Sequence, residues 1–199
     1  MTNNNSYIVL HIHPSMIKVG MQKHEIDQEL EGKGDFVQID NLNQFLKEPL
    51  TMDMKKFVYL KLAGIYEKVG MLTEAAKIYD NAGMITIAFS EKIKHFVKEA
   101  ELYIKTDSFD RVDEAMRKAM NQANTIEKQD IYFAIKDFYK RQAEVYEKEL
   151  KRNHAVRIYE KLLEMKISDM ERKEIKERLL GLYEKLGKRR EYVALEKKG

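Results

Sequence analysis

The trio Tyr-Glu-Lys occurs four times in this chain, and internal repetition constrains the possible folds more than any other feature of the sequence. The four copies begin at Tyr66, Tyr146, Tyr159 and Tyr183. A short repeated unit cannot bury its apolar face alone, so its copies stack and each copy keeps the same packing residues. The repetition therefore predicts an array of similar units within the 199 residues.

Aromatic and small residues recur at helical spacing around these trios. The first helix of each unit carries an apolar or small residue before a tyrosine, and the second carries a small residue four positions before an aromatic one. The positions are Tyr59, Leu62, Ala63, Tyr66, Ala75 and Tyr79; Phe96, Ala100 and Tyr103; Tyr139, Ala143, Tyr146, Ala155 and Tyr159; and Leu179, Leu180 and Tyr183. The chain has only two prolines, which favours helices. The pattern predicts seven or more antiparallel helices from about residue 51 to about residue 195.

Local signals predict where some of these helices begin and end. Two capping boxes mark helix starts: Asn124 with Glu127, and Ser168 with Glu171. Gly70 and Gly187 lie where a helix is expected to end in a left-handed turn.

Residues 51–199 resemble the tetratricopeptide repeat family. The spacings between Tyr66, Tyr103, Tyr146 and Tyr183 are 37, 43 and 37 residues, longer than the usual repeat of about 34, and the closing proline of the family is missing. The longer helices are more similar to those of the soluble NSF attachment proteins. The resemblance implies an all-α, right-handed superhelical stack of antiparallel helical hairpins. It also implies a non-catalytic scaffold or adaptor for protein–protein interaction.

Residues 1–50 form a different region, predicted to be an N-terminal extension with one or two short strands and a linker. Residues 6–14 alternate apolar and polar side chains and end at Pro14, which predicts a strand. Residues 34–40 can form a second strand after the glycines at 32 and 34. An unpaired strand recruits a partner, so we expect either a local hairpin or a homo-oligomer joined through the N-terminal strand.

A ladder of basic residues is the candidate binding site. In the family's hairpins, two positions seven residues apart on the first helix face the concave groove, and in this chain all eight are basic. These eight residues, called the basic ladder below, are Lys61, Lys68, Lys98, Lys105, Arg141, Lys148, Arg178 and Lys185. Clustered cations predict an acidic partner segment, such as a helix or tail rich in Asp and Glu. The competing interpretation is inherited surface charge that the neighbouring Glu67, Glu147 and Glu184 neutralise.

Two further function classes stay open at the level of sequence. Residues 140–199 hold 18 basic and 12 acidic side chains, which gives an alternative as an RNA- or ribosome-associated protein. His11 and His13 can ligate a metal together with His24, which would suit a metal-dependent enzyme. No catalytic motif supports an enzyme, and we expect no cofactor and no membrane span. The absence of cysteine fits a cytoplasmic protein.

Overall fold

The computed structural model describes residues 16–197, and every regular element in that range is an α-helix. The helices are α1 (Lys23–Leu30), α2 (Asp35–Phe45), α3 (Met52–Lys68), α4 (Leu72–Ile85), α5 (Phe89–Lys105), α6 (Phe109–Gln122), α7 (Thr125–Lys148), α8 (Arg152–Glu164), α9 (Asp169–Leu186) and α10 (Arg189–Glu196). The run from α3 to α10 confirms the prediction of seven or more helices after residue 51. None of these helices is long and apolar enough to cross a membrane.

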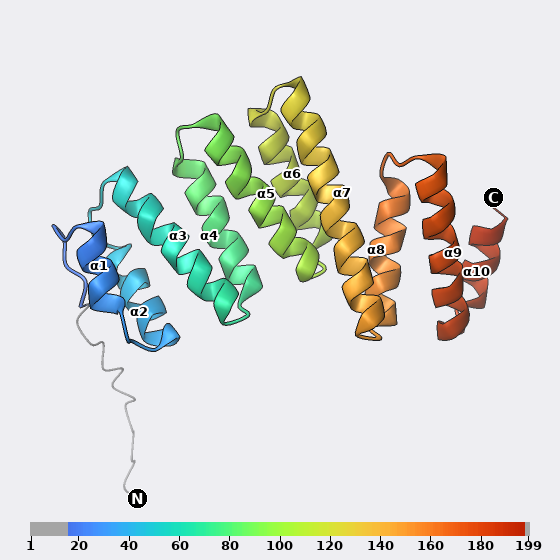
Figure 1. Cartoon of the computed structure of the whole chain (residues 1–199), viewed down its shortest axis with the longest axis horizontal. Helices are drawn as coiled ribbons and strands as arrows, with labels where there is room; N and C mark the ends of the chain where they lie inside the picture. Colours follow the sequence, from blue (N-terminus) through green and yellow to red (C-terminus); the bar gives the residue numbers. More distant parts are fainter. Residues whose placement is uncertain (1–15, 198–199) are drawn as a thin grey trace, which may run out of the picture.

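The helices form one row from the N-terminal to the C-terminal end of the molecule (Figure 1). From α3 onward the odd-numbered helices lie in the nearer layer, and the even-numbered helices lie behind them. From α2 onward each helix packs mainly on its neighbours in the chain, and α5 also contacts α7. This pattern of contacts between adjacent helices is compatible with a helical repeat.

The helices α3, α5, α7 and α9 all end with the same backbone geometry. A tyrosine carbonyl accepts a hydrogen bond of 2.8 to 3.0 Å from the N–H five residues later. The residue four positions after the tyrosine is left-handed, with φ between 54° and 78°. The tyrosines are Tyr66, Tyr103, Tyr146 and Tyr183, and the left-handed residues are Gly70, Asp107, Leu150 and Gly187. The structure thus places the four tyrosines equivalently and confirms the expected turns at the two glycines.

The core runs continuously along the stack because small residues let the helices cross closely. The alanines at the predicted crossing positions are fully buried: Ala63, Ala75, Ala100, Ala143 and Ala155. The four helix-ending tyrosines are also buried, and the hydroxyls of Tyr66, Tyr146 and Tyr183 form hydrogen bonds with residues earlier in the stack. For example, the Tyr146 hydroxyl donates to the carbonyl of Lys105 at the end of α5, at 3.0 Å. These three tyrosines therefore tie their helices to elements that precede them in the stack.

The predicted second strand over residues 34–40 is wrong, because Asp35–Phe45 is helix α2. The helical spacing of Ile39, Leu42 and Phe45 explains the difference, since all three pack into the core cluster. A local hairpin between residues 6–13 and 35–39 is therefore excluded. The predicted strand over residues 6–14, and any pairing between subunits through it, lies outside the described residues.

Leu150 occupies a left-handed position at which two equivalent turns carry glycine. An L-residue with a side chain is disfavoured in that conformation by roughly 1–2 kcal/mol. Since Leu150 is 69% exposed, its replacement removes little buried surface. We expect Leu150→Gly to raise the free energy of unfolding by about 1 kcal/mol, measured by denaturant titration. The matched control, Gly187→Leu, should lower it by a similar amount. A destabilised Leu150→Gly variant would contradict this account.

Candidate functional site

One residue of the basic ladder, Lys98, links two hairpins. Lys98 of α5 lies 2.9 Å from Glu67 of α3. The hydroxyl of Tyr79, on α4, donates a 2.9 Å hydrogen bond to the same carboxylate. Glu67 therefore joins three consecutive helices through one tyrosine and one lysine.

The same arrangement recurs two hairpins further along. Arg178 of α9 lies 3.4 Å from Glu147 of α7, and Tyr159 of α8 donates to that carboxylate. The guanidinium also contacts Glu174, four residues earlier on its own helix, at 3.2 Å. In two of the four trios, the glutamate thus neutralises a cation of the following unit.

The unit between these two has an apolar substitute for the contact. Ile104 follows Tyr103 where Glu67 and Glu147 follow their tyrosines, and it is buried. Met116 stands thirteen residues after Tyr103, the position that Tyr79 and Tyr159 occupy relative to theirs. Both members of the tyrosine–glutamate pair are therefore replaced together. Arg141, left without that carboxylate, pairs within its own helix with Asp137 at 2.9 Å.

The charges of Lys98 and Arg178 are firmly held by these contacts. Burial acts to lower the pKa of Lys98, but hydrogen bonds and attraction from Glu67 and Glu101 outweigh it and raise the pKa. Burial also acts to lower the pKa of Arg178, but the contacts with Tyr159 and Glu147 outweigh it and raise the pKa. These two cations are therefore part of the structure that holds the hairpins in register.

The remaining residues of the basic ladder divide into those that pair with a carboxylate and those that do not. Lys61 and Lys68 each reach a carboxylate of the N-terminal helices at 2.6 Å, and Lys105 reaches Glu101 at 2.7 Å. Lys148 and Lys185 are exposed and have no carboxylate partner within residues 16–197. The structure therefore gives most of the ladder an internal role and leaves these two lysines available to a ligand.

A buried acid–base cluster, which the sequence did not reveal, lies between α4, α5 and α6. Glu99 is only 3% exposed, and its carboxylate lies 2.9 Å from Lys118, which also contacts Asp80 at 2.6 Å. Burial raises the pKa of Glu99 to about 7, against the opposing effect of its hydrogen bond with Lys118. In the sequence these residues look like ordinary helix surface charges, because their burial depends on how the hairpins stack.

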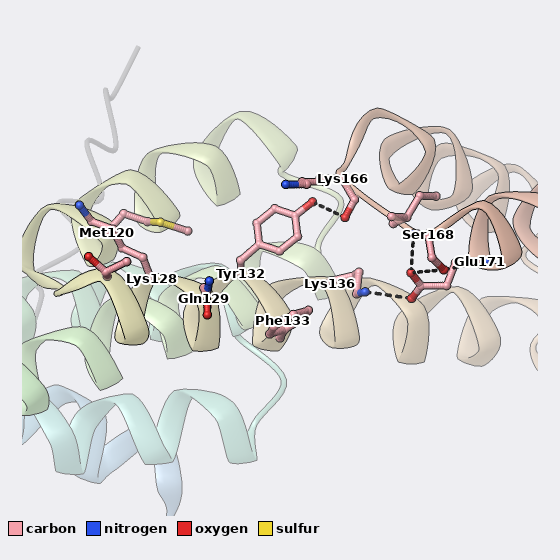
Figure 2. Close-up of a pocket in the computed structure, with 11 residues that line it drawn as sticks. Met120, Lys128, Gln129, Tyr132, Phe133, Lys136, Lys166, Ser168 and Glu171 are labelled. Atoms are coloured by element: carbon pink, nitrogen blue, oxygen red, sulfur yellow. Dashed lines mark hydrogen bonds and ion pairs between the residues drawn. The ribbon is translucent and has the colours of Figure 1, made fainter.

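A groove beside the N-terminal half of α7 was also missed by the sequence reasoning. It encloses about 750 Å³ between the end of α6, α7 and the turn that joins α8 to α9. Figure 2 shows Tyr132 pointing from α7 toward that turn, where its hydroxyl donates to the carbonyl of Lys166 at 3.0 Å. The one sequence signal was the spacing of 43 residues between Tyr103 and Tyr146, since the other two spacings are 37.

Comparisons with known proteins assign no family to this arrangement. No protein-family model matches the chain, and no curated protein matches it. Among residues 16–197, no group of three or more His, Asp or Glu side chains is placed to hold a metal ion. The proposed histidine site includes His11 and His13, which lie outside the described residues, so only His24 can be located, on α1.

Glu99→Gln should change how stability depends on pH. The pKa of Glu99 is about 7 in the folded chain, against an ordinary value of 4.5. At a pH between these two values, the folded chain keeps a proton on Glu99 that the unfolded chain has released. The stability that this proton contributes is therefore present at low pH and is lost as pH rises through this window. Relative to the native chain, the variant should gain stability from about pH 5 to about pH 8, by at most roughly 3 kcal/mol.

The measurement is denaturant unfolding of both proteins across that range. His95, whose pKa burial lowers, contributes a pH dependence of its own. Both proteins keep His95, so its contribution cancels in the difference. Parallel stability curves would contradict the raised pKa of Glu99.

Proposed function

We propose that this chain is a non-catalytic, tetratricopeptide-like adaptor whose hairpins form a right-handed superhelix and which binds an acidic segment of a partner protein. The observation that carries the proposal is a pair of exposed ladder cations, Lys148 and Lys185, which have no carboxylate partner in the described part of the chain. They occupy equivalent places on successive odd-numbered helices. The absence of cysteine is consistent with a cytoplasmic location.

The layered architecture supports this function because it offers one extended face to a ligand. The odd-numbered helices share a layer (Figure 1), so the ladder positions follow one another along the stack. The ladder residues that already pair with carboxylates present little net charge to a ligand. The unpaired lysines near the ends of α7 and α9 keep theirs, so the acidic segment is expected to lie across the C-terminal half of this face.

The internal ion pairs determine which substitutions test the proposal cleanly. Reversing Lys98 or Arg178 would place a second carboxylate beside Glu67 or Glu147, so lost binding would be confused with lost packing. Lys148→Glu together with Lys185→Glu avoids this, because both side chains are exposed and neither joins two helices. We expect this double variant to keep native stability and to lose its affinity for the acidic segment of the partner protein.

The experiment is affinity capture from a lysate of the source cell, with protein and RNA both analysed, followed by binding measurements with the partner recovered. The matched control reverses Lys77 and Arg117, which are exposed on the even-numbered helices α4 and α6, so it changes net charge equally. Binding should survive in the control and weaken with added salt in the native chain. Native affinity in the Lys148/Lys185 variant would refute the proposal. Loss of capture on nuclease treatment would favour the RNA alternative.

A further inference from the structure

Helix α7 carries two extra turns at its N-terminal end. The starts of α3, α5 and α9 (Met52, Phe89 and Asp169) each precede the tyrosine of their own helix by fourteen residues. The start of α7, at Thr125, precedes Tyr146 by twenty-one. The added seven residues complete about two helical turns, so α7 continues past the level at which the other odd-numbered helices begin.

These extra turns leave a helix face without a neighbour on the C-terminal side. Because α9 begins at the ordinary level, the short turn between α8 and α9 and the first turn of α9 form the C-terminal wall of this region. The result is the groove of about 750 Å³ seen in Figure 2. Its apolar lining consists of Met120, Tyr132, Phe133 and Ile167. Phe133 is 57% exposed, so the fold itself gains little from its apolar ring.

The walls of the groove are held in place by hydrogen bonds and ion pairs. Tyr132 fastens α7 to the α8–α9 turn through the carbonyl of Lys166. At the other end Glu171 accepts from Lys136 at 2.9 Å and also pairs with Lys140. These hydrogen bonds keep the pKa of Glu171 well below its usual range. The bond with Lys140 has the larger effect, and the bond with Lys136 the next largest. The groove is therefore formed before any ligand arrives, which reduces the cost of binding.

The charge at the groove rim is positive. Lys128 and Lys166 line it, are exposed, and have no carboxylate partner in the part of the chain that the structure describes. Lys136 and Glu171, which also line it, neutralise each other. An apolar floor between two free cations complements an apolar side chain flanked by carboxylates.

We infer that this groove is a second docking site, separate from the basic ladder, for a short amphipathic helix of a partner protein. The partner's apolar side chains lie between Phe133 and Ile167, and its Asp or Glu residues face Lys128 and Lys166. A helix suits the site because helices and one turn bound it, as in other recognition by helix-in-groove binding. Stacking of an RNA base is disfavoured, since the Lys136 ammonium lies over the Phe133 ring at 5.3 Å.

The test selects peptides from a displayed random-sequence library on the intact chain and rejects those that also bind the Phe133→Ser variant. We expect the selected peptides to combine apolar residues at helical spacing with Asp or Glu. Phe133→Ser should weaken the selected peptides by roughly tenfold or more. The matched control is Phe89→Ser, which removes a ring of similar exposure, 65%, at the start of α5. It should leave the affinity unchanged.

The charge requirement is tested separately. Reversing Lys128 and Lys166 to Glu should weaken the peptides and abolish their preference for acidic residues. Reversal of Lys33 and Lys94, which are exposed elsewhere, should not. The Lys148→Glu/Lys185→Glu variant should bind the peptides normally, so failure of the ladder proposal would leave this one standing.

Four outcomes would overturn the inference. One is a selection that yields no peptide dependent on Phe133, and another is enrichment of basic peptides. The third is a native chain that is dimeric in solution and becomes monomeric on Phe133→Ser, since a second copy would then occupy the groove. A labelled single-stranded RNA that binds with the same dependence on Phe133 would likewise replace the helical peptide as the ligand.

Discussion

The stack depends on a left-handed residue that turns the chain back after each odd-numbered helix from α3 to α9. The turn satisfies carbonyls that the helix end leaves free, and it starts the even-numbered helix at a constant distance from the buried tyrosine. That constant distance brings Tyr79 and Tyr159 to the same place beside their glutamates. Without it, neither the hairpins nor the contacts between them would repeat along the chain.

Charged residues serve the packing of this molecule as much as its surface. In the copies at Tyr66 and Tyr146, the trio Tyr-Glu-Lys contributes a buried ring, a carboxylate that pairs with a cation of the next unit, and a lysine near the helix end. Where the chain has Ile104 instead of that glutamate, Met116 replaces the tyrosine that would have bonded to it. The trio is therefore first a device for joining helices. The cations that no carboxylate of residues 16–197 neutralises are the ones we propose for binding.

The departure from regular repetition is where a specific surface arises. Seven added residues lengthen α7 without lengthening the helices beside it, and Phe133, which follows them, stays 57% exposed although its ring contacts Tyr132 and Lys136. The bonds from Tyr132 to Lys166 and from Glu171 to its two lysines keep that face open and ordered. The regular parts of the array supply rigidity, and the irregular helix supplies a shape that the other hairpins do not have.

The sequence by itself determined the helical class, the spacing of the four tyrosines and the helix ends at Gly70 and Gly187, because these follow from local periodicity and turn chemistry. It failed at residues 34–40, where a short apolar run fits a strand or a helix until its packing partner is known. Only the tertiary structure decided that Lys98 and Arg178 are ion-paired while Lys148 and Lys185 have no carboxylate partner among the described residues. The same holds for the burial of Glu99 and the groove beside α7. Each depends on side chains that are distant in sequence, and their approach is set by how the hairpins stack.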